Sequence, residues 1–379
     1  MSVRRRVLVI PSWYPSAKDP TAGIFILQQV RALSAFADVA VLHVASDSEA
    51  SGPTVTVEDG VTVVRLRVVG SGAFRRFIDY RSAGRASFEA LRSAWGLPVI
   101  VHVQALFPAA MIARDILRRE RIPYVVTEHS EEYLAASKRR LVSTPGVLSL
   151  LLRPLAREAA RTITVSRFLG ERLEALQLAH DPVVIPNVVP VMPATPIPLE
   201  PPHAIAHVSI MSPAKNLGML LDAVDLLRAR RQDFRLMLVG DGECRAELEA
   251  AVAASGLSVF VEFTGRKSVA DVHAIQASCA FSVVSSTHET FSVSAAESLM
   301  CGRPVLSTRC GGPEEFVSAE NGRLIESDNA EAMAEGLDWM LDHFSEFDPA
   351  TLHEYARCRF APDIVAARIL DVYAEVLDA

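Results

Sequence analysis

Short apolar runs alternate with longer stretches of helical periodicity along the whole chain. Runs rich in Val and Ile predict buried strands, and the amphipathic patterns between them predict crossover helices. The expected strands are Val7–Pro11, Val39–Val44, Val61–Val69, Val99–Val103, Tyr124–Thr127 and Thr162–Val165 in the first half, and Ala204–Ile210, Arg235–Val239, Val259–Thr264, Ala280–Val284, Val305–Ser307 and Gly322–Ile325 in the second. The expected helices include Asn216–Arg230, Cys244–Ser255 and Ser292–Cys301. Each half is therefore predicted to be a parallel sheet covered by helices, an α/β architecture.

Eight prolines lie between positions 182 and 202. Proline lacks an amide hydrogen and has a fixed φ, so this segment should be a stiff, extended connector rather than a helix or a central strand. We predict a Rossmann-like domain over residues 1–190, a proline-rich linker over 191–202 and a second Rossmann-like domain over 203–360. A final helix over 361–379 is expected to return to the N-terminal domain. The two domains should face each other across a cleft, with ligands at the carboxyl ends of their strands.

Composition and charge narrow the classes of function. The 379 residues are 50% hydrophobic and carry a net charge of -7, which disfavours nucleic-acid binding because nucleic-acid-binding domains are usually basic. The first 190 residues hold 24 basic and 17 acidic side chains, and the remainder hold 14 and 28. No apolar run approaches the ~20 residues that span a bilayer, and no small-residue cleavage site follows the first run. A cytoplasmic protein is therefore expected.

Cysteine usage and motif spacing exclude further classes. The five cysteines include no Cys-x-x-Cys pair, which fits a reduced cytoplasmic protein. No group of His, Cys or carboxylate side chains has the spacing of a metal site, so neither a metal nor a resident cofactor is expected. Neither first strand is followed by Gly-x-Gly-x-x-Gly, which argues against a nicotinamide-dependent dehydrogenase.

The most informative stretch, SSTHETFSVSAAE, runs from Ser285 to Glu297. A strand should end just before it and a helix should begin near Ser292, so that unpaired amides at the helix start would attract an anion. Glu297 would lie about 7.5 Å along that helix, a spacing suited to a ribose. Glu289 would precede the helix. The structural alternative is a capped helix with one surface and one loop glutamate, because carboxylates are common at helix starts.

This arrangement resembles the Glu-x7-Glu motif of the family 4 (group 1) retaining glycosyltransferases, which have the two-domain GT-B fold. Similar motifs follow in family order along nearly the whole chain: PSWYPSAKDPTAGIFILQQVRAL, VVTEHSEEY, TVSRFL, VIPNVV, LMLVGDGECRAELEA, VEFTGR, ETFSVSAAESLMCGRPVLSTRCGGPEEF and NGRLIE. The resemblance implies a first domain that binds the acceptor and a second domain that binds a nucleotide sugar.

The resemblance also implies roles for single residues. Glu289 would bond hydroxyls of the donor sugar, Glu297 would bond the ribose, and His129 would contact the sugar near its anomeric carbon. A lone histidine is often only a buried side chain, but the string Thr-Glu-His-Ser at a strand end favours the site role. The implied catalytic residues are Glu289, His129 and Lys215, and the implied donor-binding residues are Gly23, Lys215, Arg266, Thr290, Phe291, Ser292, Val293 and Glu297.

One position departs from the family pattern. Ile210 stands where family members carry an arginine, five residues before the lysine that grips the diphosphate, and Lys215 is that lysine. Losing one charge-assisted hydrogen bond costs ~1.5 to 3 kcal/mol, or roughly 10- to 150-fold in affinity. Arg266 or Lys267 could partly replace the charge, although their motif position places them beside the nucleotide base.

The sequence thus predicts a retaining, metal-independent glycosyltransferase acting in polysaccharide or glycolipid biosynthesis. Its donor would be a nucleotide diphosphate sugar, a UDP-sugar ahead of a GDP-sugar, and its acceptor a saccharide or a lipid-linked saccharide. Catalysis would rest on orientation and on neutralising the departing diphosphate, whose oxygen takes the proton of the acceptor. The alternative is a degenerate member that binds a nucleotide sugar or glycan without turnover, which Ile210 favours and the intact motif residues oppose.

Two stretches of the first half, residues 75–81 and 138–153, mix basic and apolar side chains. Such segments suit a helix lying on an anionic membrane surface. Taken singly, each fits better with an amphipathic helix packed on the sheet. Together with the basic excess of the first 190 residues, they lead us to expect peripheral contact with the inner face of a membrane, and no nucleic-acid partner.

Overall fold

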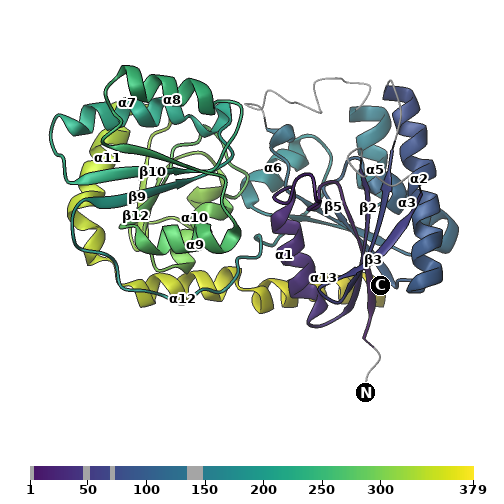
Figure 1. Cartoon of the computed structure of the whole chain (residues 1–379). Helices are drawn as coiled ribbons and strands as arrows, with labels where there is room; N and C mark the ends of the chain where they lie inside the picture. Colours follow the sequence, from purple (N-terminus) through teal and green to yellow (C-terminus); the bar gives the residue numbers. More distant parts are fainter. Residues whose placement is uncertain (1–3, 46–51, 69–72, 135–147) are drawn as a thin grey trace. The chain divides into compact units, whose positions relative to one another are not determined.

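The computed structural model describes residues 4–45, 52–68, 73–134 and 148–379 (Figure 1). The chain divides into two compact units. The first unit contains the described residues up to Tyr133, residues 148–188 and Pro362–Ala379. The second unit contains mainly Val189–Ala361. Each unit is a parallel-dominated sheet with helices.

The described strands of the first unit form one sheet in the order β3-β4-β2-β1-β5-β6-β7-β8. They are β1 (Arg6–Pro11), β2 (Asp38–Ala45), β3 (Thr54–Glu58), β4 (Val61–Arg67), β5 (Ile100–Gln104), β6 (Tyr124–Glu128), β7 (Arg161–Thr164) and β8 (Val183–Val184). Neighbours pair in parallel, except that β3 and β4 form an antiparallel hairpin. Val7 of the central strand lies beside Val39 on one side and Ile100 on the other. The order reverses between β1 and β5, which makes a switch point at the carboxyl edge.

The last helix of the chain completes the core of the first unit. The described helices of this unit are α1 (Ile24–Ser34), α2 (Ala73–Ala94), α3 (Ala110–Glu120), α5 (Arg153–Glu158), α6 (Arg167–Ala175) and α13 (Pro362–Asp378), with a short 3₁₀ helix η1 (Glu131–Tyr133) and a short π-helix η3 (Leu148–Leu152). α13 packs beside α1 (Figure 1). Its buried residues Val365, Ile369, Val372 and Tyr373 recur at helical spacing and join the core formed with β1, β2 and α1.

The second unit is built on a parallel sheet in the order β11-β10-β9-β12-β13-β14. Its described strands are β9 (His203–Val208), β10 (Phe234–Val239), β11 (Val261–Gly265), β12 (Phe281–Val284), β13 (Val305–Thr308) and β14 (Gly322–Ile325). Its described helices are α7 (Leu217–Arg228), α8 (Arg245–Ala254), α9 (Val269–Ser278), α10 (Val293–Met300), α11 (Ala330–His343) and α12 (Pro349–Phe360), with turns η4 (Pro213–Lys215), η5 (Gly312–Glu315) and η6 (Phe344–Glu346). The strand order reverses between β9 and β12, so this pair defines the switch point of the second sheet.

The predicted α/β fold class and the predicted strands are confirmed, with strand ends shifted by up to two residues. One of these shifts concerns β9, which ends at Val208, two residues before its predicted end. Ile210 therefore lies in the loop that follows β9. The sequence prediction missed β3 and β8. β3 is an edge strand whose side chains are all exposed, and β8 is only two residues long, so neither produces a buried apolar run.

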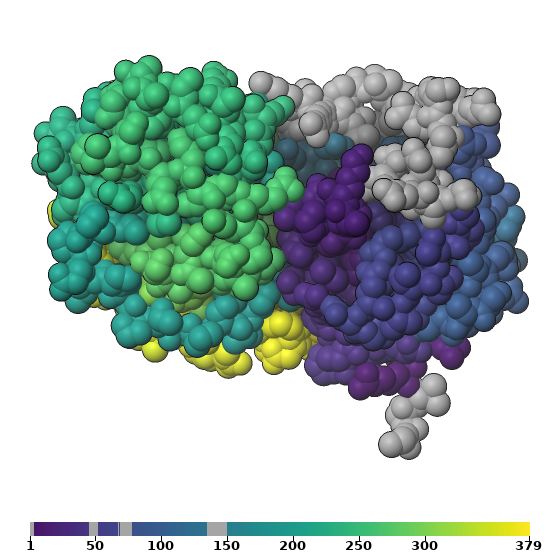
Figure 2. Space-filling model, viewed as in Figure 1, coloured from purple at the N-terminus to yellow at the C-terminus, as the bar shows by residue number. Residues whose placement is uncertain are grey.

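The buried side chain of Arg303 fixes the segment before β9 that contains Thr195 and Pro196. This segment, teal in Figure 2, lies on the surface of the second unit. The Nη1 group of Arg303 donates to the carbonyl of Thr195 at 2.7 Å, and its Nη2 group donates to the hydroxyl of Thr195 at 2.7 Å and the carbonyl of Pro196 at 2.8 Å. Nη2 also donates to the carbonyl of Ala277 on α9. Because Arg303 is fully buried, desolvation lowers its pKa, and these main-chain carbonyls stabilise its charge.

Replacing Arg303 by Met should lower the free energy of unfolding by about 2 to 4 kcal/mol, because several buried carbonyls would lose their donor. Urea unfolding followed by circular dichroism measures the change. Arg228→Met is the matched control, since Arg228 pairs with Asp225 and donates to the carbonyl of Gly256 at 3.2 Å at a partly exposed position, where such contacts are worth about 1 kcal/mol or less. Equal losses in the two variants would show that Arg303 does not hold the segment.

Candidate functional site

Lys215 and Glu289 form an ion pair at the switch point of the second sheet. Lys215 ends the turn η4 after β9, and Glu289 lies in the loop after β12. Lys215 Nζ is 2.6 Å from Glu289 Oε1, and the Ser286 hydroxyl donates to the same oxygen at 2.7 Å. The Lys215 and Glu289 side chains are only 19% and 14% exposed. Open α/β sheets bind ligands at such a position, beyond the carboxyl ends of the strands.

Glu289 is held in its charged form. Burial raises the pKa of Glu289, but the charge and hydrogen bond of Lys215, with the hydroxyl of Ser286, outweigh burial and leave the pKa below its usual value. The carboxylate and the ammonium group therefore neutralise each other inside the unit. An anion that binds here must compete with Glu289 for Lys215.

Hydrogen bonds to the main chain tie together the two loops that carry this pair. The Ser285 hydroxyl donates to the carbonyl of Lys215 at 2.7 Å. The amide of Thr287 donates to the carbonyl of Ala214 at 2.9 Å. The loops after β9 and β12 are thus fixed to each other, and the position of the ion pair follows from that of the two strands.

A close approach of two backbone segments holds Glu289 from the other side. Its amide donates to the carbonyl of Cys310 at 2.7 Å, and its carbonyl accepts from the amide of Gly312 at 2.9 Å. A Cβ atom at Gly312 would lie 2.4 Å from the carbonyl oxygen of Thr290 and 2.6 Å from the Cα of Phe291. Only glycine fits there.

Residues 290–293 lead into α10. The ring of Phe291 is buried against Phe316 at 5.3 Å and Phe360 at 5.5 Å between centroids, so its side chain belongs to the core and only its backbone can serve a ligand. Ser292 has a φ of 71°, an uncommon conformation for a residue other than glycine. The first amides of a helix lack acceptors within it. The start of α10 therefore offers amide donors close to the loop of Glu289.

Glu297 is the fifth residue of α10, and helix α9 holds it. His273 Nε2 lies 3.2 Å from Glu297 Oε1, and the side chain of Glu297 is 14% exposed. The side-chain Nε2 of Gln276 donates to the carbonyl of Ser294 at 2.9 Å, which fixes the first turn of α10 against α9. His273 and Gln276 were not predicted from the sequence, because nothing in the local pattern of α9 indicates that it packs beside α10.

His207 of β9 lies near Lys215 and carries no charge. Burial, with a further contribution from the charge of Lys215, lowers the pKa of His207 to about 4. Its Nδ1–H donates to the carbonyl of Val283 at 3.0 Å, so Nε2 accepts from the Ser209 hydroxyl at 2.9 Å. The positive charge at this point of the sheet therefore resides on Lys215.

The three positions that bear on the missing arginine, Ile210, Arg266 and Lys267, are exposed. Ile210 is 68% exposed, so it is not part of the core. Arg266 follows β11, which is separated from β9 by β10. Arg266 therefore lies two strands away from the strand that leads to Lys215.

Gly23 and His129 belong to the first unit. Gly23 precedes α1 with a φ of 63°, and a Cβ atom there would lie 2.4 Å from the carbonyl oxygen of Trp13, so glycine is required. The ring of Phe25 packs on the ring of His129, with 4.8 Å between centroids. The structure thus brings the turn at the start of α1 together with His129, which follows β6.

His129 is buried and uncharged. Burial lowers the pKa of His129 to about 3, and a hydrogen bond with the Asn187 side chain only partly opposes this effect. Its Nε2 lies 2.7 Å from Oε1 of Gln104 at the end of β5. Gln104 was not predicted as a site residue, although a glutamine at the end of a fully buried strand is a signal that could have identified it.

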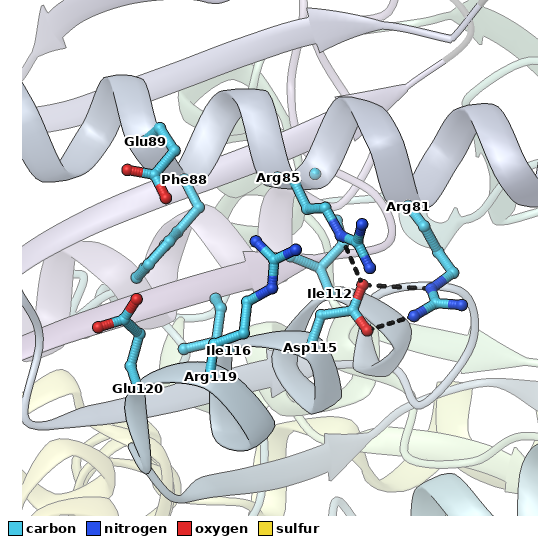
Figure 3. Close-up of a pocket in the computed structure, with 10 residues that line it drawn as sticks. Arg81, Arg85, Phe88, Glu89, Ile112, Asp115, Ile116, Arg119 and Glu120 are labelled. Atoms are coloured by element: carbon cyan, nitrogen blue, oxygen red, sulfur yellow. Dashed lines mark hydrogen bonds and ion pairs between the residues drawn. The ribbon is translucent and has the colours of Figure 1, made fainter.

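The basic stretch at 75–81 is described only in part. The side chains of 75–77 and all of residues 138–147 lie outside the described residues. Arg81 Nη2 lies 2.5 Å from Asp115 Oδ1 on α3, and Arg85 joins the same carboxylate (Figure 3). Tyr80 is buried. Where its side chains are described, Tyr80 packs into the unit, Ile78 is 50% exposed, and Arg81 is neutralised by Asp115.

Three general features of the described residues bear on the class of site. No helix among them is both long enough and apolar enough to cross a membrane. The same residues contain no group of three or more His, Cys, Asp or Glu side chains placed to hold a metal ion. Cys244, Cys279, Cys301, Cys310 and Cys358 are free thiols.

Two family models match the chain. The model described as "Glycosyl transferases group 1" matches residues 202–343, and the model described as "Glycosyl transferase 4-like domain" matches residues 21–188. The first match contains Lys215, Glu289 and Glu297. The second match contains Gly23 and His129.

Relatives and solved structures extend this similarity. An uncharacterized glycosyltransferase of Methanocaldococcus jannaschii is 28% identical over 238 residues, which are 62% of this chain and 63% of that protein. The 2-deoxystreptamine glucosyltransferase of Streptomyces kanamyceticus is 28% identical over 69% of this chain and 77% of its own length. The structure of a sucrose-phosphate synthase from Thermosynechococcus elongatus has a TM-score of 0.81 at 19% identity, covering 99% of this chain and all of that one.

Ile210→Arg should tighten the binding of inorganic diphosphate. Because position 210 is exposed, we expect a gain of about 1 kcal/mol, or about fivefold, rather than the larger value of a buried contact. Calorimetric titration measures the dissociation constant. Val259→Arg is the matched control, since Val259 is 70% exposed and precedes β11, whereas Ile210 follows β9. The control therefore lies at the amino ends of the strands, away from Lys215. Equal gains in affinity in both variants would mean that an added positive charge tightens diphosphate binding wherever it lies on this unit, and not because it is near Lys215.

Proposed function

Because this chain belongs to the group 1 glycosyltransferases and has the GT-B fold, we propose that it transfers a sugar from a nucleotide diphosphate sugar to an acceptor hydroxyl, with retention of the anomeric configuration. The observation that carries the proposal is the Lys215–Glu289 pair at the switch point, next to the start of α10. An ammonium group, helix-start amides and a carboxylate further along the helix match a diphosphate joined to a ribose.

The donor would bind to the second unit through three kinds of contact. The diphosphate would take Lys215 and the amides at 290–293, where charge and helix dipole both favour an anion. The ribose hydroxyls would bond to Glu297, which His273 already orients. When the diphosphate engages Lys215, an oxygen of Glu289 becomes able to bond hydroxyls of the donor sugar. The ion pair of the free protein thus keeps both groups in place for the ligand.

The transfer step requires stabilisation of the leaving group. The bond between the anomeric carbon and the diphosphate oxygen breaks, the acceptor oxygen bonds to the same face of that carbon, and the acceptor proton passes to the released diphosphate oxygen. Negative charge grows on the diphosphate as this happens, and Lys215 with the α10 amides stabilises it. These groups supply the positive charge that the step needs, so the proposed mechanism is metal-independent.

The role proposed for His129 is to contact the donor sugar without transferring a proton. With a pKa of about 3, the ring is neutral over the physiological range and does not act as a general acid there. Gly23 would let the backbone of the first unit approach a phosphate closely.

One observation favours a second candidate, a member of the family that binds a nucleotide sugar or glycan without turnover. Ile210 leaves the diphosphate without the arginine contact that the family resemblance leads us to expect. Slow hydrolysis of the donor in the absence of an acceptor separates the two candidates, because only an enzyme releases the sugar. UDP-sugars are the first to test, with GDP- and ADP-sugars beside them.

The proposed acceptor is a saccharide or a lipid-linked saccharide in glycan biosynthesis. Its support is the basic excess of the first 190 residues, since exposed Lys and Arg near an anionic leaflet contribute about 1 kcal/mol each. The pairing of Arg81 with Asp115 lowers the number of charges that this surface can present.

The wild type should hydrolyse at least one nucleotide sugar. Of two glutamate variants, one should mainly lose affinity for the nucleotide and the other should mainly lose turnover. Glu297→Ala should weaken the binding of the bare nucleoside diphosphate roughly 10- to 150-fold, because charged hydrogen bonds to the ribose are lost. Glu289→Ala should lower turnover about 100-fold and leave that affinity within about threefold, because Lys215 becomes available. Calorimetry and a hydrolysis assay measure the two effects, with Glu335→Ala on the exposed face of α11 as control. Equal effects of both variants on affinity would contradict these roles.

Flotation with liposomes tests the membrane part of the proposal. The protein should float with phosphatidylglycerol vesicles at low salt and be released at high salt, because screening removes the attraction. Replacing Arg75, Arg76, Arg139 and Arg140 by Ser should abolish flotation. Protein that stays at the bottom with anionic and phosphatidylcholine vesicles alike would leave a small, soluble saccharide as the acceptor.

A further inference from the structure

One edge of the first sheet is an exposed strand. Among the described strands, β3 pairs only with β4, and all five of its side chains, from Thr54 to Glu58, are exposed. Val55 is 41% exposed and Val57 is 72% exposed. Native proteins usually protect such an edge with proline, lysine or a bulge, because its unpaired peptide groups are a template for another strand. β3 contains neither residue type and its register with β4 is uninterrupted, so this edge is open to strand pairing.

The hairpin turn after β3 shows which of its peptide groups are available. Asp59 and Gly60 both have a positive φ, 48° and 80°, as in the type I′ turn of a two-residue hairpin. Glu58 and the first residue of β4 flank this turn and form a hydrogen-bonded pair. Hydrogen-bonded positions alternate along a strand, so every second residue before Glu58 also faces β4. The N–H and C=O groups of Val55 and Val57 therefore point away from the sheet.

The sequence of β3, Thr-Val-Thr-Val-Glu, is complementary to itself in one antiparallel register. With Thr56 on a two-fold axis, Val55 of each copy lies opposite Val57 of the other, and the outward groups of these residues exchange four hydrogen bonds. Thr54 lies opposite Glu58, so its hydroxyl can donate to the carboxylate. All five residues of each strand then have a partner, whereas any other two-fold register leaves some of them unpaired.

Apolar area and charge favour the same register. The two valines of each strand lie on one face, where the pairing covers side chains that are otherwise exposed. On the other face, the two Glu58 side chains lie at opposite ends of the paired strands. Each Glu58 also pairs with Arg65 of its own chain. No like charges are therefore directly opposite each other across the axis.

We propose that β3 is an interaction surface for a second copy of this chain, and that two copies pair edge to edge with Thr56 on the two-fold axis. The two eight-stranded sheets then form one continuous sheet. The paired strands contribute five residues per copy, against the ~20 to 30 per side of a stable interface. The dimer is therefore weak and forms as the protein concentration rises. This inference is independent of the proposed function.

Cysteine cross-linking tests the register. Residues directly opposite each other at a non-hydrogen-bonded position have Cα atoms about 4.5 Å apart, a distance that a disulfide spans. Thr56→Cys should therefore form a disulfide-linked dimer when oxidised with copper phenanthroline. Thr54→Cys is the matched control, since it is also exposed on β3 but faces Glu58. It should cross-link no more than the wild type, whose Cys358 is exposed. Equal cross-linking of the two variants, or none in either, would overturn the proposal.

A charge at position 56 tests the association itself. In sedimentation velocity, the mass of the wild type should rise with concentration toward that of two chains. Thr56→Lys places two lysines directly opposite each other, so we expect dimerisation to weaken at least about fivefold. Thr56→Glu should have the same effect through its own like charges. A mixture of the two variants should associate again, because the axis then joins opposite charges.

A matched control separates this effect from that of charge alone. Ala251→Lys adds the same charge at an exposed position of α8 in the second unit and should associate as the wild type does. The melting temperature of each variant shows that the chain remains folded. A wild type that is monomeric at every concentration would overturn the proposal. Association that Thr56→Lys leaves unchanged would place the contact elsewhere on the surface, and a mixture that stays monomeric would show that position 56 does not face itself. Either result would also overturn it.

Discussion

The rest of this structure depends on one constraint, that neighbouring parallel strands end at the same edge of their sheet. Lys215 and Glu289 are 74 positions apart in the sequence, yet they meet because β9 and β12 are neighbours and each enters its loop at this edge. The same rule brings Gln104, at the end of β5, beside His129, which follows β6. The chemistry of both units is therefore a consequence of strand order, with helices and turns adjusting the final distances.

Burial controls which of the site groups are charged. His102, His129 and His207 are all neutral because desolvation lowers their pKa values far below the physiological range. Lys215 and Glu289 keep their charges because each is the partner of the other. Neutral imidazoles and buried ions have different requirements for burial. A neutral imidazole needs only hydrogen-bond partners, whereas a buried ion also needs a counter-charge. A ligand with its own negative charge can replace one partner of such a pair at little cost in desolvation.

Most of the fold could be predicted from the sequence because buried parallel strands are recognisable as apolar runs. β3 could not be predicted because its Thr and Val residues are exposed on an edge strand, and the role of Arg303 could not be predicted because it depends on a linker that folds back on the second unit. In the site, the motif predicted Glu289 and Glu297 as separate ligand contacts. It did not predict the pairing of Glu289 with Lys215 or of Glu297 with His273, since these arise from tertiary packing. His102 and Gln104 were visible as polar residues inside an apolar strand, but their partners come from α1, β6 and α13.

The position of α13 sets an order for the folding of the newly made chain. The core of the first unit includes Val365, Ile369 and Tyr373, which are synthesised only after the whole of the second unit. The second unit is almost continuous in sequence and ends at Ala361. During synthesis it is therefore the later-made unit that can reach its final packing first, while the sheet of the first unit still has an uncovered apolar surface. The first unit becomes complete only after α13 has been made, so loss of α13 would affect a core whose other residues were synthesised before the second unit.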